Sequence, residues 1–384
     1  MIEVITTERI PIKLWLNDIE SGALEQAKNV ANLPFAFSHI AIMPDSHQGY
    51  GMPIGGVLAA TDAIVPNAVG VDIGCGMCSL RTNIPVIDED KLKRIMSSIR
   101  KSIPVGFRHH KEPQDLIWMP ELHQNLPIVE QEYESATQQV GTLGGGNHFI
   151  EIQKGSDGFI WMMIHSGSRN IGFTVAGHYH DLAKKLNKQW FSEFIKDLAY
   201  FPSDTEEYHI YKAEMDYCIE FALSNRKLMM ERVKEAFADA FPDVEFSHFI
   251  NKPHNFASEE IHFGQTCIIH RKGATRARKD EFGMIPGSQG TSSFIVKGKG
   301  NPESFESCSH GAGRVMSRNQ ARKILDLKEV QKKLENKGII HAVRNRSDLD
   351  EAPDSYKDIN RVMELQKDLV DIEIELKPLA VVKG

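Results

Sequence analysis

The sequence predicts a mixed α/β (α+β) protein, with mixed or antiparallel sheets in one large domain that carries a helical insertion. Short apolar runs rich in β-branched and aromatic residues lie on both sides of a strongly helical middle segment. Glycine-rich segments stand at the ends of most of these runs, and no repeat, low-complexity tract or linker divides the chain. We therefore expect a single domain over 1–384, with the helical insertion at about 173–241.

The expected elements follow from the spacing of apolar residues. Helical periodicity predicts helices at 88–101 and across much of 173–199, and one long helix or two joined helices at 206–241. The stretch 107–124 mixes proline, charge and isolated aromatic residues, so we expect an irregular surface insertion there. The runs that predict strands are 37–44, 55–61, 148–152, 159–165, 265–271 and 292–298.

Composition and charge limit the classes of function. The 384 residues are 41% hydrophobic, enough for a sizeable core. The N-terminus lacks the features of a signal peptide and no apolar run approaches roughly 20 residues, so we expect a cytoplasmic protein with no membrane partner. The five cysteines then indicate free thiols. The net charge of −7 argues against a protein coated in nucleic acid, although 271–279, RKGATRARK, is locally basic.

Several histidines stand in short loops rich in glycine, serine and asparagine beside the predicted strands. Such loops expose backbone N–H groups and carry little side-chain bulk, so phosphate oxygens or a metal ion can approach closely. A single histidine of this kind is equally well explained as a turn cap or a buried hydrogen-bond donor. Their recurrence favours a binding site. The loops read AVGVDIGCGM, GTLGGGNHFIE, IHSGSRNIG, NKPHNF and SCSHGAGR.

One of these loops has a spacing suited to metal ions. Asp72 and Cys75 flank Gly74, and a sharp turn there would direct a carboxylate and a thiolate to one point. Cys75 and Cys78 also form a CxxC pair, which could hold structural zinc or a redox disulfide. Because no second CxxC exists, we expect Cys78 to pack within a strand. The histidines that could complete a two-metal site are His148, His165 and His254.

The usual nucleotide motifs are missing. The chain has no GxxxxGK[ST], no GxGxxG after a strand and no KxDG, although the loop IPGSQGTSS offers neutral donors to a nucleotide. After His310 the sequence GRVMSRNQARKIL predicts a helix with Arg314, Arg318 and Arg322 on one face. Beside a glycine-rich turn, this stripe favours a phosphate cradle over a solvated face. His310 itself could be a metal ligand, a base or a nucleophile.

Together these stretches resemble the RtcB family of GTP-dependent RNA-splicing ligases, from the first strands to the last residues. The resemblance implies an enzyme that joins an RNA 3′-phosphate, or a 2′,3′-cyclic phosphate after opening it, to a 5′-hydroxyl. It also implies GTP as co-substrate, Mn2+ as cofactor, histidine–GMP and RNA(3′)pp(5′)G intermediates, and a role in tRNA splicing or RNA repair. The stretches are MPDSHQGYGMPIGG, VGVDIGCGM, GTLGGGNHFIE, HSGSRNIG, RKGATRA, IPGSQG, SCSHGAGRVMSR, YKDI and VVKG.

The resemblance also assigns roles to residues of this chain. It implies that Cys75 bridges two metal ions and that His310 is the nucleophile that takes GMP. Asp45 is weighed equally as a turn residue and as the group that orients or deprotonates the 5′-hydroxyl. The remaining implied metal ligands are Asp72 and His148 at one ion and His165 and His254 at the other. The implied GTP contacts are Asn147, Glu151, Ser288, Ser292, Gly311, Gly313, Tyr356 and Lys383, and the implied phosphate and RNA contacts are Arg169, Lys272, Arg314 and Arg318.

Two other functions stay open at this point. A dimetal phosphoesterase or cyclic phosphodiesterase would use metal-activated water, with His310 as general acid. An RNA-binding or partner-binding module would use the CxxC and the histidines to hold structural zinc. Thiolate and imidazole ligands favour zinc in raw affinity, so manganese follows from the resemblance alone. One departure from the family pattern is Pro253, which precedes His254 where many relatives have paired histidines.

Overall fold

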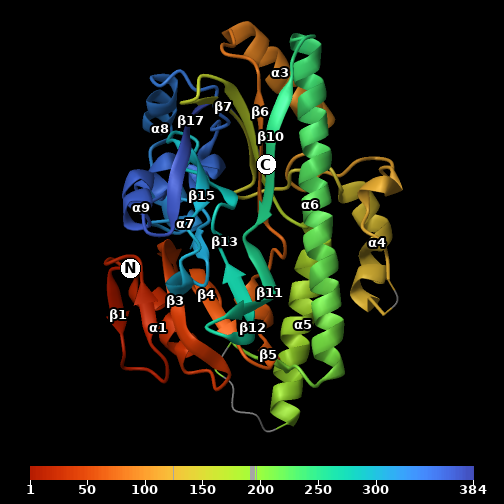
Figure 1. Ribbon diagram of the computed structural model, residues 1–384. Coiled ribbons are helices and arrows are strands. Elements are labelled where there is room, and N and C mark those ends of the chain that lie inside the picture. Colours follow the sequence, from red (N-terminus) through yellow and green to blue (C-terminus); the bar gives the residue numbers. More distant parts are fainter. Residues whose placement is uncertain (124, 191–194, 196) are drawn as a thin grey trace.

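Two large β-sheets form the centre of the molecule in the computed structural model, which describes residues 1–123, 125–190, 195 and 197–384 (Figure 1). The six-stranded sheet has the order β1-β2-β3-β4-β12-β11, and only its β2–β3 pair is parallel among the described strands. Its strands are β1 (Glu3–Ile5), β2 (Ile12–Leu14), β3 (Ala36–His47), β4 (Ile54–Ala60), β12 (Gln265–Lys272) and β11 (Asn255–His262).

The seven-stranded sheet is antiparallel throughout, with the order β10-β6-β8-β7-β17-β15-β14. Its strands are β10 (Phe246–Pro253), β6 (Gly76–Thr82), β8 (Ile160–Ser166), β7 (Phe149–Gly155), β17 (Val370–Lys383), β15 (Ser293–Gly298) and β14 (Phe282–Ile285). Two short pairs complete the described strands, namely β13 (Ala274–Arg276) with β16 (Ser307–Ser309) and β5 (Ala63–Ile64) with β9 (Phe201–Pro202). The fold class expected from the sequence is confirmed.

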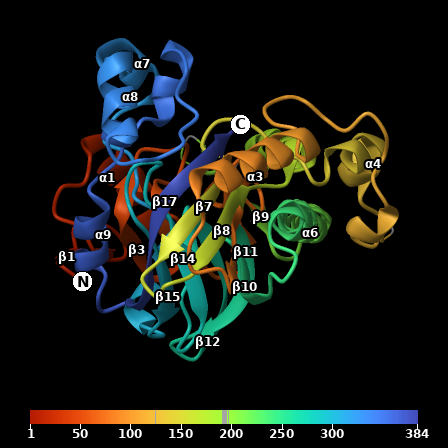
Figure 2. The same ribbon diagram turned by 90° about the horizontal axis from the view of Figure 1, so that it is seen from above.

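Helices cover the outer sides of the two sheets (Figure 2). The long helix α6 packs against α3 and α5 and against β6, β8 and β10, while α7, α8 and α9 lie on the opposite side of the molecule (Figures 1 and 2). The helices are α1 (Ser21–Ala31), α2 (Pro66–Val69), α3 (Glu89–Ser102), α4 (Pro127–Gln139), α5 (Arg169–Gln189), α6 (Glu206–Ala240), α7 (Arg318–Ile324), α8 (Leu327–Glu335) and α9 (Ile359–Leu365). None of the described helices combines the length and the apolar character that crossing a bilayer requires.

Apolar packing joins the sheets and the helices. One cluster of buried side chains fills the space between the two sheets, with Met43 and Val57 of the first sheet and Phe294 and Val296 of the second. A second cluster packs α3 and α6 against the seven-stranded sheet. At roughly 25 cal/mol per Å2 of apolar surface removed from water, such continuous cores supply the main driving force for this arrangement. These apolar clusters fix the strands and helices, and the loops at the strand ends can then form a site.

The strand predictions agree with the structure within a few residues, and the periodicity at 206–241 corresponds to one helix rather than two. Cys78 lies in β6 and packs among apolar side chains, as expected. The insertion at 107–124 is irregular apart from one short 3-10 turn, Leu116–Trp118, and residue 124 lies outside the described chain. The helix predicted within 173–199 begins earlier, at Arg169, and ends at Gln189; residues 191–194 and 196 lie outside the description.

The helix predicted to follow His310 was wrong at its start. It begins only at Arg318, because Gly313 adopts a positive φ of 73° and Ser317 caps the helix by accepting from the backbone N–H of Gln320. Arg314 therefore lies outside the helix, in an isolated bridge to Tyr356. The three arginines do not form one stripe on a helix face, although two of them still converge, as described below.

The buried residues Asn225 and Arg226 of α6 hold the loops that surround the site. The Arg226 guanidinium is fully buried and donates to the carbonyl oxygens of Gly74 and Ser166, both at 2.9 Å, and to Asn251 Oδ1 at 2.7 Å. Asn225 Oδ1 accepts from the backbone N–H groups of the loop that begins at Gly141. A single helical turn thus fixes loops that precede or follow four strands.

We expect Arg226→Met to lower the free energy of unfolding by about 3 kcal/mol, because two buried carbonyl oxygens and the partly buried Asn251 Oδ1 then each lose a donor at a cost of about 1 kcal/mol or more. Urea unfolding followed by circular dichroism measures this loss. The matched control is Lys227→Met, since Lys227 is the exposed neighbour on the same helix. A loss below about 1 kcal/mol for Arg226→Met would show that water replaces the guanidinium.

Candidate active site

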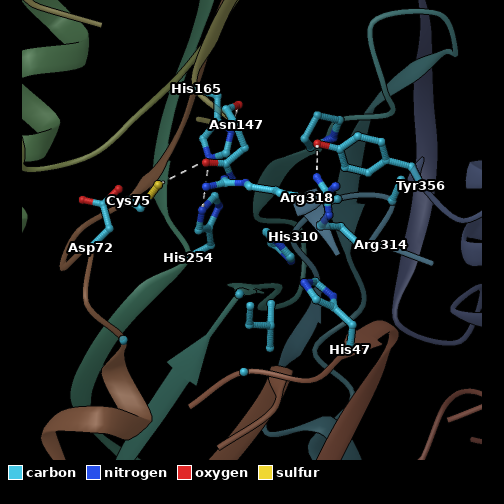
Figure 3. A pocket seen from close by; sticks show the side chains of 18 of the residues that line it. His47, Asp72, Cys75, Asn147, His165, His254, His310, Arg314, Arg318 and Tyr356 are labelled. Atoms are coloured by element: carbon cyan, nitrogen blue, oxygen red, sulfur yellow. Dashed lines mark hydrogen bonds between the residues drawn. The ribbon is translucent and has the colours of Figure 1, made fainter. Parts of the chain in front are cut away.

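The glycine-rich loops of both sheets meet around one cleft of about 960 Å3 (Figure 3). Figure 3 shows His310 between two groups of side chains, with Cys75, His165 and His254 on one side and Arg314, Arg318 and Tyr356 on the other. The predicted residues that line the cleft are Asp72, Cys75, Asn147, His165, His254, Lys272, Ser288, His310, Gly311, Gly313, Arg314, Arg318, Tyr356 and Lys383. The predicted residues outside this lining are Asp45, His148, Glu151, Arg169 and Ser292.

The first group is a cluster of ligand atoms around Cys75. The Cys75 Sγ lies 3.3 Å from His165 Nε2 and 3.5 Å from His148 Nε2. His148 Nε2 lies 3.1 Å from Asp72 Oδ2, and His165 Nε2 lies 3.4 Å from His254 Nε2. The sulfur therefore stands between an Asp72–His148 pair and a His165–His254 pair.

The orientation of two imidazoles suits metal binding. Backbone carbonyl oxygens accept from Nδ1 of His148, at 3.0 Å from Leu143, and from Nδ1 of His165, at 3.2 Å from Asn147. These bonds place the proton on Nδ1, so the Nε2 lone pair of each ring points into the cluster. The Nε2 atoms of His165 and His254 face each other at 3.4 Å, and in the tautomer of His254 that carries its proton on Nδ1 neither of them has a hydrogen to share. A cation satisfies both lone pairs.

The protonation states agree with this interpretation. Burial lowers the pKa of His165 and of His254 well below the usual value, which keeps both rings in the neutral form that ligates metals. Burial, followed by the charge of Asp72, raises the pKa of the Cys75 thiol well above its ordinary value. A divalent cation at the cluster would reverse that balance and stabilise the thiolate. The donor set therefore fits a divalent cation among Cys75, His148 and His165, with Asp72 and His254 beside it.

His310 lies next to this cluster and is held from behind by Asp45. The His310 ring centroid lies 4.9 Å from that of His254, and His310 Nδ1 lies 2.6 Å from Asp45 Oδ2. The same carboxylate oxygen accepts from the backbone N–H groups of His310 at 3.0 Å and Gly311 at 3.2 Å. Burial alone would raise the pKa of Asp45, but His310 outweighs it and the pKa is lowered. Asp45 is thus an ionised, fully buried partner of His310 and not part of the cleft wall.

Glu351 organises the second group of side chains. Its carboxylate oxygens lie 3.3 Å from Arg314 Nη1, 3.2 Å from Arg318 Nε and 3.6 Å from Lys383 Nζ, and the Tyr356 hydroxyl donates to it. Burial would raise the pKa of Glu351, but the charges of Lys383 and Arg318 outweigh it and the pKa is lowered. One buried carboxylate therefore gathers three cations at the cleft.

Sequence reasoning missed Glu351 and His47. Glu351 lies five residues before Tyr356, an implied GTP contact. This closeness in sequence was the only signal that Glu351 belongs to the site. His47 belongs to the MPDSH stretch and lines the cleft; its Nδ1 lies 3.0 Å from the Asp45 carbonyl oxygen. Burial lowers the pKa of His47 to about 4, so its ring is neutral.

Of two further predicted basic residues, Arg169 lies beside the candidate metal cluster and Lys272 lies elsewhere in the lining of the cleft. Arg169 Nη1 lies 3.4 Å from His148 Nδ1, and its guanidinium packs against Gly144 so closely that a Cβ there would overlap it. Lys272 Nζ donates to the carbonyl oxygens of Asn67, at 2.9 Å, and Tyr50. Burial lowers the pKa of Lys272 to about 7.

The other predicted nucleotide contacts divide into two groups. Ser288 and Asn147 line the cleft, whereas Ser292 donates to Glu375 Oε1 at 2.6 Å outside the lining.

Glu151 is buried in β7, where burial raises its pKa to about 8. Register places Glu151 opposite Val381 of β17, two residues before Lys383. The nearest charged partner of Lys383 is Glu351 and not Glu151.

Comparisons with known proteins give one consistent family. The family model described as tRNA-splicing ligase RtcB matches residues 26–124 and 119–384. The RNA-splicing ligase RtcB of Escherichia coli strain K12 is 39% identical, over 100% of this chain and 99% of the relative, and RtcB1 of another Escherichia coli strain matches equally. The tRNA-splicing ligase RtcB of Nanoarchaeum equitans is 32% identical over 98% of this chain and 95% of the relative.

We expect Cys75→Ala to weaken the binding of Co2+, a spectroscopic stand-in for the divalent cation, by more than about tenfold. The thiolate-to-cobalt absorption band should vanish with the sulfur. Because the Cys75 pKa is raised, cation binding displaces a proton, and the affinity of the unaltered protein should rise with pH. Cys267→Ala, a buried cysteine of β12, is the control. A cobalt–thiolate band that survives in Cys75→Ala would exclude Cys75 as a ligand.

Proposed function

Since the chain belongs to the RtcB family, we propose that it is a GTP-dependent RNA ligase. In this proposal it joins an RNA 3′-phosphate, or a 2′,3′-cyclic phosphate after opening it, to a 5′-hydroxyl end in tRNA splicing or RNA repair. The observation that carries the proposal is His310: a buried carboxylate orients its ring, and it lies between a candidate metal cluster and a group of cations. That arrangement suits a nucleophile that attacks a polyphosphate.

The residues around Cys75 would hold Mn2+. They are Asp72, Cys75, His148, His165 and His254. The choice of manganese rests on the family resemblance, since thiolate and imidazole by themselves favour zinc. Divalent ions bound there would neutralise phosphate charge and polarise phosphoryl oxygens.

His310 carries out the first step in this proposal. Its Nδ1 proton is donated to Asp45, so the Nε2 lone pair is available on the other side of the ring. Nε2 attacks the α-phosphorus of GTP, a P–N bond forms, and the bond to the β-phosphate oxygen breaks to release pyrophosphate. The ring gains positive charge as this happens, and the adjacent Asp45 carboxylate stabilises it. Asp45 is thus a positioning residue for His310.

The GMP group then passes to RNA. An oxygen of the RNA 3′-phosphate attacks the phosphorus of histidine–GMP, and His310 leaves with its electron pair to give RNA(3′)pp(5′)G. The oxygen of the 5′-hydroxyl then attacks the RNA phosphorus, its proton passes to solvent, and GMP departs with the electron pair of the broken P–O bond, because activation has turned a poor leaving group into a good one. In this proposal the phosphates of both substrates bind to basic residues: Lys272, Arg314 and Arg318 in the cleft lining, and Arg169 beside His148.

Guanine recognition is assigned to the end of β17. Phe149 of β7 faces Lys383 across the strand pair, and Glu151 follows on the same face of the sheet. A carboxylate at this position can accept from the N1 and amino groups of guanine. Glu351 keeps Lys383 beside Arg314, which links the base end of the nucleotide to its phosphates.

Incubation with Mn2+ and GTP labelled at the α-phosphate should attach acid-labile, base-stable label to the protein. We expect no label on His310→Ala. For Asp45→Asn, loss of the fixed ring orientation should slow labelling by about 100-fold or more. His209→Ala, an exposed histidine of α6, is the control. A phosphodiesterase or a zinc-holding module would give no label on the unaltered protein, and that result would refute the proposal.

The pKa of Glu151 predicts how GTP binding depends on pH. Below pH 8 the free carboxyl is protonated, and guanine needs the ionised form, so binding releases a proton. Affinity for GTP should therefore rise about tenfold per pH unit from pH 6 towards 8 and then level off. Calorimetry on His310→Ala, which cannot react, measures this. Glu151→Gln in the same background should bind weakly and without the slope. A slope that survives Glu151→Gln would assign the proton to another group.

A further inference from the structure

A second, smaller cavity of about 250 Å3 adjoins the active-site cleft, and Lys383 lines both. Three arginines from separate parts of the chain converge on it: Arg100 near the end of α3, Arg108 in the segment that follows, and Arg344 before the 3-10 turn Arg346–Glu351. Arg100 is half-buried, and Arg108 and Arg344 are exposed. The cavity is therefore open to solvent on a strongly basic side.

These three arginines lack the counter-charges that the cleft arginines have. Arg314 and Arg318 pair with Glu351, whereas Arg100, Arg108 and Arg344 form no ion pair with any carboxylate of the described chain. The acid in the cavity wall, Asp348, accepts instead from the backbone N–H groups of Arg344 at 2.8 Å and Asn345 at 2.9 Å. Burial and then the charge of Arg344 lower the pKa of Arg100. An anion in the cavity would relieve this repulsion.

The cavity lies next to the cleft, so its arginines extend the series of basic residues that lines the cleft. The backbone N–H of Gly106, two residues before Arg108, donates to the carbonyl oxygen of Gly144 at 2.8 Å. Arg169 and Arg318 lie against the same glycine loop, where a Cβ on Gly144 or Gly146 would meet their guanidinium groups. Gly144, Gly145 and Gly146 thus add no side chains of their own between cleft and cavity, and basic side chains lie against this loop.

We propose that Arg100, Arg108 and Arg344 form a subsite for backbone phosphates of the RNA strand whose end occupies the cleft. This inference rests on the proposed function. It specifies the region outside the cleft that the RNA substrate contacts. Guanidinium groups bind phosphate oxygens through paired N–H donors, and such contacts position a strand without reading its sequence. The triphosphate of GTP is the other source of phosphate. It is disfavoured because it must reach His310, which lines the cleft and is not among the residues that line this cavity.

The test uses a triple variant, Arg100→Gln/Arg108→Gln/Arg344→Gln. The matched control is Arg94→Gln, since Arg94 is an exposed residue of α3. Fluorescence anisotropy measures binding of a single-stranded RNA with a 3′-phosphate, without GTP, over a range of salt concentrations. The triple variant should bind at least about tenfold more weakly, and its slope of log affinity against log salt should fall by about 0.7 for each arginine. A strand of only two nucleotides should bind both proteins equally.

Guanylylation of His310 by GTP provides the second measurement and shows that the variant is folded. It should match the unaltered protein in rate and in the GTP concentration required. Unchanged RNA affinity and salt slope in the triple variant would overturn the subsite, and so would a raised GTP requirement, which would assign the cavity to the nucleotide. Absence of guanylylation in the unaltered protein would instead refute the proposed ligase, and the RNA-binding result would still decide the subsite.

Discussion

The buried guanidinium of Arg226 is the contact on which the geometry of the site depends. It binds Gly74, next to Cys75, and Ser166, next to His165, and through Asn251 it reaches the strand that ends just before His254. The ligand atoms come from loops far apart in sequence, and their spacing of 3 to 4 Å would not survive independent motion of those loops. The helical insertion is therefore an integral part of the site, because α6 carries this arginine.

The site places groups in the charge states that its substrates require. Imidazoles that would ligate a cation are kept neutral by burial, as at His165, whereas Asp45 stays ionised because His310 outweighs the cost of burial. Glu351 likewise stays ionised among three cations. Burial of these groups costs free energy, which His310 offsets at Asp45 and the neighbouring cations offset at Glu351 before any substrate binds. Such preorganisation favours function over maximal stability.

Local sequence predicted what depends on local chemistry. Apolar β-rich runs located the inner strands, and the glycine-rich loops located the cleft, because both signals lie within about ten residues. The terminal strand β17 was not predicted, although VDIEIEL alternates apolar and charged residues with the period of a strand; Pro378 interrupts that pattern, and the pairing with β7 is remote in sequence. Glu351 was missed for the same reason: its partners approach it only through tertiary packing. Gly313 and Ser317 indicate that the following helix starts late, because glycine permits a positive φ and serine favours a helix N-cap. The predicted helix did not take these two residues into account.

The terminal strand connects the two basic regions of the molecule. β17 pairs with β7, which carries Glu151, and its last residues bring Lys383 to the wall shared by the cleft and the smaller cavity. On the cleft side, Glu351 neutralises the cations and fixes their positions. On the cavity side, Arg100 and Arg344 repel each other, and neither forms an ion pair with a carboxylate of the described residues. Neutralised cations suit a small ligand that must be held in one pose, whereas unpaired exposed cations suit a flexible polyanion held mainly by charge. The difference in pairing thus separates the two kinds of phosphate that the molecule would bind.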